Sequence, residues 1–186
     1  VQERLNVGRQ ARLERLRRRV RPFMLRRTKD LVAEELPAKQ EHELHVPLEP
    51  KHKKLYDLVL QRERKKVLGM VGDLDKHRMT VFRSLTLLRM LALSPQIVSD
   101  EYADVPSSKL EALFSGLDEV LGEGHRIIVF SQFTSCLRLV AERLKTAGVD
   151  YAYLDGSTRN RRGAIDGFRS GTAPVFLISL KAGGFG

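Results

Sequence analysis

The chain has 186 residues, of which 42% are hydrophobic and 30% charged, and its formal net charge is +10. This length is enough for one hydrophobic core, or for one lobe with an appendage, and the composition is typical of a globular protein rather than a disordered one. No apolar run approaches the roughly 18 residues that cross a bilayer, and a single cysteine excludes an intramolecular disulfide framework.

The positive charge is concentrated at the N-terminus. Residues 1–30 contain eleven Lys or Arg and three Asp or Glu, so this stretch carries most of the net charge. Apolar residues recur there at helical spacing up to about Met24, and Pro22 is expected to end or kink the helix. A concentrated basic stretch suits a phosphate backbone or an acidic surface, although a solvated helix face is the alternative.

The middle of the chain is predicted to form a strand followed by two helices. Residues 41–48 alternate in the manner of a half-buried strand, with His42 and His45 on opposite faces. Pro50 suits the first turn of the next helix, and a second, leucine-rich helix is expected to end before Pro95. Because no second cluster of His, Cys or carboxylates stands at ligand spacing, the sequence predicts no metal site.

Residues 99–108 are rich in Asp, Ser and Pro, which is typical of an exposed linker, so we place a domain boundary there. The prediction is a basic helix, linker and helical insertion over residues 1–106 and a separate lobe over residues 107–186. Ser107 or Ser108 is expected to cap the first helix of that lobe. Short apolar runs then alternate with helical patterns, which predicts βαβ units and a parallel sheet. The runs are Ile127 to Phe130, Tyr151 to Leu154 and Val175 to Ile178.

Polar residues and glycines follow each predicted strand. They are Ser131 to Phe133, Asp155 to Thr158 and Ser179 to Gly184. Because parallel strands end at one edge of the sheet and ligands bind there, we expect these residues to line a common crevice. They supply hydroxyls, amides, one ammonium and glycines that let backbone N–H groups approach an anion. The chemistry predicts an edge that binds phosphate or sugar–phosphate.

The order VFSQF, LDGST and LISLKAGGFG resembles motifs IV, IVa and V of the second RecA-like lobe in Swi/Snf-type ATPases, the DNA translocases of helicase superfamily two that include chromatin remodellers. Upstream, RPFMLRRTK, LPAKQEHELHVPL and SSKLEAL are similar to the segments that precede that lobe. The resemblance covers nearly all of the chain after Arg21. It implies an α/β fold with a partial RecA-like, doubly wound parallel sheet, preceded by a mostly helical linker region.

The resemblance also implies which residues contact ligands. The positions that match motif residues near the DNA backbone are Gln132, Thr134, Gly156, Ser157 and Lys181. The candidates for contacts with DNA phosphate or with the first lobe are Arg26, Arg27 and Lys29, and the positions at the nucleotide edge are Gly184 and Gly186. No catalytic residue is expected in this chain. The structural alternative for LDGST is a tight turn, in which Asp155 accepts from local N–H groups and Ser157 or Thr158 caps the next helix.

Two motifs of the family are absent from the sequence: a phosphate loop of G-x-x-x-x-G-K-[ST] form and the arginine-bearing motif VI. The sequence stops inside motif V, so we expect a fragment or truncated product of a larger DNA-dependent ATP hydrolase, inactive alone. ATP and Mg²⁺ would be bound mainly by the first lobe of the parent enzyme. Neither is expected in this chain alone.

The resulting hypothesis is the C-terminal motor lobe of an ATP-dependent double-stranded-DNA translocase or remodeller, which grips the DNA backbone and forms one wall of the ATP cleft. Its expected partners are double-stranded DNA and the first RecA-like lobe, with no membrane. The expected location is the nucleoid-associated cytoplasm of a prokaryote or the nucleus of a eukaryote. The alternatives are a nucleic-acid-binding or protein-binding module without an ATPase role, and an RNA helicase lobe. A small-molecule enzyme is disfavoured, because no acid–base pair or nucleophile–histidine set follows the strands.

Overall fold

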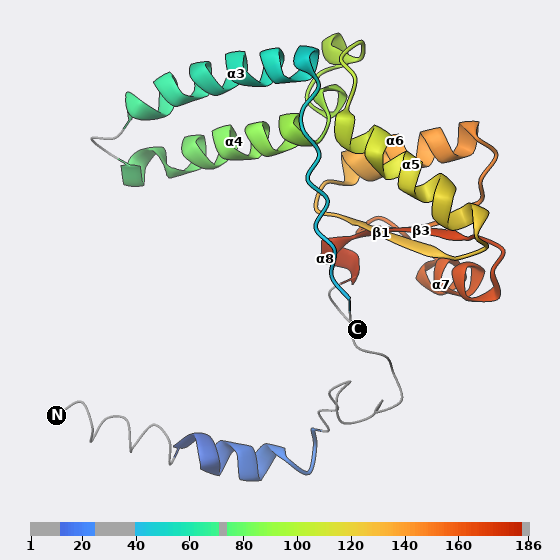
Figure 1. Ribbon diagram of the computed structural model, residues 1–186. Helices are drawn as coiled ribbons and strands as arrows, with labels where there is room; N and C mark the ends of the chain where they lie inside the picture. The colour runs from blue at the N-terminus through green and yellow to red at the C-terminus, as the bar shows by residue number, and fades with distance from the viewer. Residues whose placement is uncertain (1–11, 25–39, 71–73, 184–186) are drawn as a thin grey trace. The chain divides into compact units, whose positions relative to one another are not determined.

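The computed structural model describes residues 12–24, 40–70 and 74–183 (Figure 1). The chain divides into two compact units, residues 1–44 and residues 45–186. Residues 12–20 form a helix in the first unit, and every other helix and strand described below belongs to the second. The domain boundary predicted between residues 106 and 107 is not tested by this division, and it stays a prediction.

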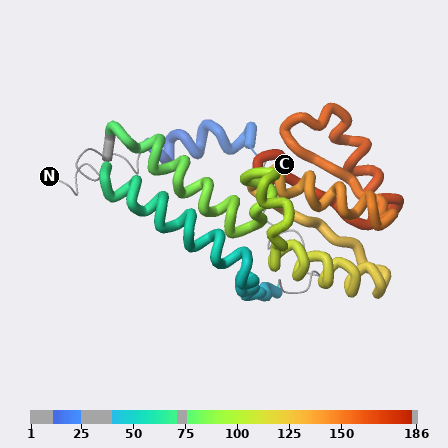
Figure 2. The backbone as a smooth tube through the Cα atoms, turned by 90° about the horizontal axis from the view of Figure 1, so that it is seen from above, coloured from blue at the N-terminus to red at the C-terminus, as the bar shows by residue number. Residues whose placement is uncertain are grey.

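A helical hairpin opens the second unit. Helix α3 (Pro50–Leu68) has Pro50 at its first position, as expected, because the missing N–H of proline costs nothing there. Helix α4 (Leu74–Leu93) stops just before Pro95, also as expected. The two helices run side by side in both views (Figures 1 and 2).

The strand predicted over residues 41–48 is wrong. This segment is extended but has no ladder partner, and Leu44, placed on the predicted buried face, is 76% exposed. An alternating sequence forms a strand only where another strand pairs with it, and none does so here among the described residues.

Buried polar contacts hold α3 to α4. Ser84 Oγ donates to Glu63 Oε2 at 2.6 Å, with both residues almost fully buried. The fully buried His52 reaches the carbonyl oxygen of Leu91 through Nε2 at 2.7 Å. The Ser84 hydroxyl is the main reason that the pKa of Glu63 lies below its ordinary value, and partial burial of the carboxylate opposes this effect.

The hairpin joins the sheet region through two short 3₁₀ turns, η2 (Pro95–Ile97) and η3 (Asp100–Tyr102), and then α5 (Ser108–Gly122). Ser107 caps α5: its Oγ accepts from the backbone N–H of Leu110 and donates to the carbonyl oxygen of Leu93 at 2.7 Å. The predicted serine cap is therefore confirmed, and the same hydroxyl also fixes the end of α4 against the start of α5.

All three predicted apolar runs form strands. They are β1 (Ile127–Ser131), β2 (Tyr151–Leu154) and β3 (Val175–Ser179), parallel and in the spatial order β1-β3-β2. The connecting helices are α6 (Thr134–Thr146) and α7 (Arg161–Ser170). Helix α6 connects β1 to β2, which lies on the far side of β3, and α7 then connects β2 back to β3 between them. Because such crossovers are right-handed and these two run in opposite directions, α6 and α7 lie on opposite faces of the sheet (Figure 1).

The core lies on both faces of the sheet. Leu137 of α6 and Leu177 of β3 are fully buried in the cluster that α5 and α6 form on one face. On the other face, Phe168 of α7 packs on Phe176 with ring centroids 5.3 Å apart, and α8 (Leu180–Gly183) completes the cluster. Strand β3 is buried along its whole length, as expected for the central strand of a parallel sheet covered on both sides.

None of the helices described is long and apolar enough to cross a membrane.

Candidate functional site

The strand register brings the predicted contact residues to one edge of the sheet. Ser131 at the end of β1 pairs with Ser179 at the end of β3. Leu154 pairs with Ile178, so Asp155 stands at the same level as Ser179. Gln132, Gly156 and Lys181 follow these three ends directly, which is the convergence that the sequence predicts.

The loop after β2 is closed on itself by a buried carboxylate. Asp155 is only 4% exposed, and its Oδ1 accepts from the backbone N–H and the hydroxyl of Ser157 at 2.8 and 2.6 Å. Its Oδ2 accepts from the Tyr153 hydroxyl at 3.3 Å, and its own N–H donates to Thr158 Oγ1 at 2.9 Å. The Ser157 hydroxyl is the main cause that lowers the pKa of Asp155, against the opposing effect of its burial. The tight turn that the sequence suggests for Asp155 is therefore present.

The predicted cap of the next helix is wrong. Neither Ser157 nor Thr158 caps α7; Asn160 does, through its Oδ1, which accepts from the backbone N–H of Gly163 at 2.9 Å. A Cβ at Gly163 would meet the Asn160 side chain within 3.0 Å, so the glycine is required for this close approach. The pair Asn160 and Gly163 is a cap signal present in the sequence, but it lies outside the LDGST motif.

Gly156 and Ser157 differ in what they offer a ligand. Gly156 is exposed, its φ is negative, and a Cβ there would meet no atom within 4 Å. Neither a close contact nor a positive φ therefore requires glycine at this position, and the backbone there is exposed. The Ser157 hydroxyl hydrogen is used by Asp155, so a phosphate, which only accepts, could take it only by breaking that bond.

The loop after β1 is held from the helical hairpin. Arg89 of α4 donates from Nη2 to Gln132 Oε1 at 2.6 Å, and its Cζ lies 5.9 Å from the ring centroid of Phe133. Phe133 occupies the N-cap position of α6 without a side-chain capping bond, and Thr134 begins the helix. Arg89 is a site residue that our sequence reasoning missed. The available signal was a cation that interrupts the apolar run of α4.

Strand β3 leads directly into α8, without an intervening loop. Ser179 is buried, and its Oγ accepts from the backbone N–H of Ala182 at 3.3 Å. Lys181 is exposed, and no carboxylate pairs with it within the described residues. Its ammonium is thus an unneutralised cation at the edge where the strands end.

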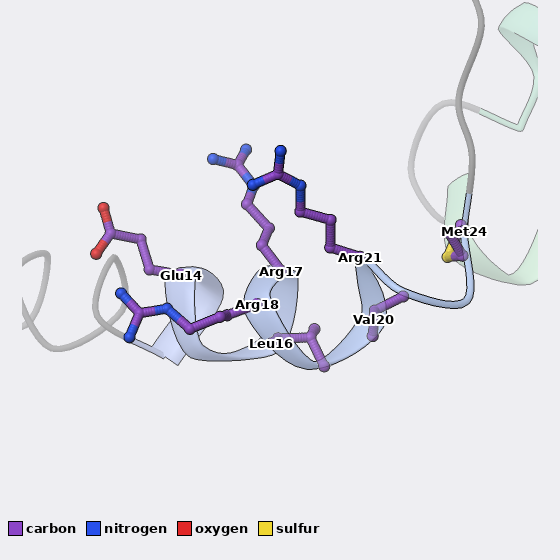
Figure 3. A pocket seen from close by; sticks show the side chains of 7 residues that line it. All are labelled: Glu14, Leu16, Arg17, Arg18, Val20, Arg21 and Met24. Carbon is purple, nitrogen blue, oxygen red and sulfur yellow. The ribbon is translucent and has the colours of Figure 1, made fainter.

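The remaining predicted contact residues lie outside the described residues. They are Arg26, Arg27, Lys29, Gly184 and Gly186. The helix over residues 12–20 is described by itself: Arg17 and Arg21 extend from one side and Leu16 and Val20 from the other (Figure 3). This amphipathic basic helix agrees with the helical pattern predicted for the N-terminal segment.

The described residues contain no cluster of metal-ligating side chains. Within the ranges 12–24, 40–70 and 74–183, no group of three or more His, Cys, Asp or Glu could hold a metal ion. Asp155, the acid at the strand ends, has both carboxylate oxygens engaged by its own loop. Cys136 is buried, which raises the pKa of its thiol, as expected for a structural rather than a nucleophilic cysteine.

Comparisons with known proteins agree with this arrangement. The family model of the SNF2-related domain matches residues 2–97, and that of the helicase conserved C-terminal domain matches residues 108–186. An uncharacterized ATP-dependent helicase of Mycoplasma pneumoniae is 34% identical over 92% of this chain. The SWI/SNF-related matrix-associated actin-dependent regulator of chromatin subfamily A member 1 of Mus musculus is 31% identical over 97%. The chain spans only 16% and 18% of the lengths of these two relatives.

Solved structures share the fold. The C-terminal part of the Fun30 ATPase domain has a TM-score of 0.63 and 22% identity, covering 81% of this chain and 71% of that one. The Sulfolobus solfataricus SWI2/SNF2 ATPase core in complex with dsDNA has a TM-score of 0.65 and 21% identity, covering 89% and 36%. These likenesses confirm the expected α/β RecA-like fold. With the family models and the sequence relatives, they place this chain in the SNF2 family of helicase-like ATPases, of which it carries the C-terminal helicase domain.

Proposed function

We propose that this chain contributes the DNA-backbone grip and one wall of the ATP cleft to an ATP-dependent double-stranded-DNA translocase or remodeller. One observation carries the proposal: the strand ends bring hydrogen-bond donors and cations together where no free carboxylate opposes them. Within the part of the chain that the structure describes, no carboxylate pairs with Lys181 or Arg89, and the acid at this edge, Asp155, is engaged by its own loop. Such an edge favours an anion.

The available groups suit a phosphodiester backbone. The Lys181 ammonium supplies charge, the exposed backbone at Gly156 allows close approach, and the Gln132 amide has N–H donors. Thr134 adds a hydroxyl at the start of α6, where backbone N–H groups point outward. Contacts of this kind position DNA without reading its bases, so binding should be insensitive to sequence and fall steeply with salt.

Ser157 contributes to this DNA contact mainly by ordering the loop after β2. Its hydroxyl orders the turn through Asp155, which fixes the backbone at Gly156 for contact with a phosphate. The basic residues Arg26, Arg27 and Lys29 extend the proposal to the N-terminal segment, as contacts with phosphate or with the first RecA-like lobe.

The ATP-related part of the proposal rests on the family. Relatives are described as an ATP-dependent helicase and as a SWI/SNF-related regulator of chromatin, and a solved SWI2/SNF2 ATPase core was captured with dsDNA. ATP and Mg²⁺ would be held mainly by the first lobe, while Gly184 and Gly186 of this chain would border the nucleotide. The chain's own residues would then grip DNA and close one side of the cleft.

The test is direct binding of this chain to duplex DNA, single-stranded DNA and single-stranded RNA, measured by fluorescence anisotropy at several salt concentrations. We expect weak binding that prefers duplex DNA, is equal for unrelated sequences and weakens steeply as salt rises. A preference for single-stranded RNA would instead identify an RNA helicase lobe. No binding to any of the three at low salt would contradict a grip that this chain can make by itself.

A further inference from the structure

Among the described residues of the second unit, three arginines lie over phenylalanine rings, and two of them have charged or helix-end partners within the fold. Arg143 lies 4.1 Å from the Phe114 ring centroid and donates through both Nη atoms to the Glu111 carboxylate at 2.6 and 2.9 Å. This bidentate pair cancels the charge of Arg143 and fixes α6 against α5. Contacts within the fold therefore account for both the charge and the position of Arg143.

Arg126 is used in a different way. Its Nη1 donates to the carbonyl oxygens of Phe168 and Arg169 at 2.9 and 3.0 Å, and its Cζ lies 5.4 Å from the Phe168 ring centroid. These carbonyls belong to the last turn of α7, where a cation is favourable because the helix end is partially negative. Arg126 therefore acts as a C-terminal cap that no ligand needs to complete.

Arg89 is the exception. It is exposed, and within the described residues its interactions are one hydrogen bond to the Gln132 amide and the contact with the Phe133 ring. A guanidinium has five N–H donors and the amide oxygen is neutral, so Arg89 keeps its charge and most of its donors. The ring and the amide hold the side chain in one place without neutralising it.

The hydrogen bond also sets the orientation of Gln132. Arginine cannot accept a hydrogen bond, so the amide oxygen of Gln132 must face Arg89 and the amide nitrogen must face away. The two side chains together then present only donors, beside a net positive charge, at the edge where β1 ends. A ligand that only accepts and is negatively charged fits this pair, and a phosphodiester oxygen has both properties.

We infer that Arg89 and Gln132 bind one backbone phosphate of DNA together, with Arg89 both contacting the phosphate and holding the Gln132 amide toward it. The inference rests on the proposed DNA-binding function and adds to it a residue of α4. The helical hairpin thereby becomes part of the grip, since the phosphate contact joins α4 to the loop after β1.

The experiment measures duplex-DNA affinity of the whole chain across a salt series for Arg89→Ala, Gln132→Ala and the double variant. We expect Arg89→Ala to weaken binding about tenfold at low salt and to reduce the slope of log Kd against log salt by about one, equally for unrelated sequences. Gln132→Ala should weaken binding less, and should add almost nothing in the Arg89→Ala background, because its amide is held by Arg89.

A matched control is available on the same helix. Arg83 is also an exposed arginine of α4, it has no hydrogen-bond or ion-pair partner among the described residues, and it lies on a different side of the helix from Arg89. Arg83→Ala removes the same charge from the same element and should change affinity less than twofold, as expected for a solvated charge. Arg89→Gln, which keeps the carbon chain up to Cδ and removes the charge, replaces Arg89→Ala if the alanine variant has a lowered Tm.

The outcomes separate the inference from the function on which it rests. If the unmodified chain binds duplex DNA while Arg89→Ala retains the affinity and salt slope of Arg83→Ala, the inference is wrong and the proposed function stands. Additive effects of Arg89→Ala and Gln132→Ala would also overturn it, because the two side chains would then act independently. If the unmodified chain fails to bind, a DNA grip that this chain makes by itself is contradicted, and the inference falls with it.

Discussion

The loops after β1 and β2 lie at the same edge of one sheet, yet they use similar residues in opposite ways. The loop after β2 directs its donors inward to the buried carboxylate of Asp155. The loop after β1 contains no acid, and Gln132 is bound instead by a cation from α4. The loop after β2 is therefore a closed hydrogen-bonded unit, whereas the loop after β1 is an open set of donors.

This difference separates residues that shape the edge from residues that can meet a ligand there. A hydroxyl such as that of Ser157 counts as a phosphate donor only if its hydrogen is free, and the buried acid has taken it. Gln132 shares its loop with no such acceptor, so its amide nitrogen stays available. A buried carboxylate beside a candidate donor therefore predicts a structural role for that donor.

The strongest test of the closed loop is Asp155→Ala. The substitution leaves the N–H of Ser157 and the hydroxyls of Ser157, Tyr153 and Thr158 without their acceptor, so we expect the free energy of unfolding to fall by about 3 kcal/mol. Urea denaturation measures the loss. Asp150→Ala removes an exposed aspartate just before β2 and serves as control, with an expected change below about 0.5 kcal/mol. Equal losses in the two variants would mean that Asp155 does not organise the loop.

Acid should weaken the fold through Asp155. Because its folded-state pKa lies below the unfolded value, its contribution is fully present above the unfolded pKa and is lost as pH falls through the folded pKa. Stability measured by urea denaturation should therefore be level near neutral pH and decline below about pH 4 to 5, near the ordinary pKa of carboxylates. Asp155→Asn should decline less steeply than the unmodified chain; an unchanged slope would contradict this account.

Glu63 is a second buried carboxylate, and it lies in the helical hairpin of α3 and α4. Ser84→Ala removes the hydroxyl that donates to Glu63 at 2.6 Å and leaves the buried acid with only the longer contacts of Arg62 and Lys66. We expect a loss of about 2 kcal/mol in the free energy of unfolding. Ser115→Ala on α5, an exposed serine, is the control and should change stability by less than about 0.5 kcal/mol. A loss no larger than that of the control would show that the hairpin does not depend on this bond.

Much of the fold was predictable from the sequence because the signals are local. Short apolar runs bounded by glycines predict the three strands, Pro50 predicts the start of α3, and Ser107 predicts the cap of α5. The strand predicted over residues 41–48 is wrong because alternation gives a side-chain pattern but not a partner strand. The sequence could suggest the inward turn of Asp155 for the same local reason, since its acceptors and donors lie within three residues.

Arg89 could not be assigned in this way. Its partner Gln132 lies 43 positions later in the chain, and only the packing of α4 beside the end of β1 brings them together. In the sequence it is one arginine among many: it interrupts the apolar run of α4, but Arg83 on the same helix does so as well. What separates the two is that Gln132 and the Phe133 ring hold the guanidinium of Arg89 in place, which is a property of the folded chain.

The smallest expected effect concerns Lys181, the exposed lysine of α8. Lys181→Ala should weaken duplex-DNA binding about fivefold at low salt, less than Arg89→Ala, because an ammonium meets phosphate as a point charge without the fixed fork of arginine. Lys145→Ala is the matched control: it removes an exposed lysine from the last turn of α6, at the far end of the strands. If both lysine variants lose the same affinity, the attraction is general to the positively charged surface. If only Lys181→Ala loses affinity, the DNA contacts lie at the edge of the sheet where the strands end. The donors of the loop after β1 lie at the same edge.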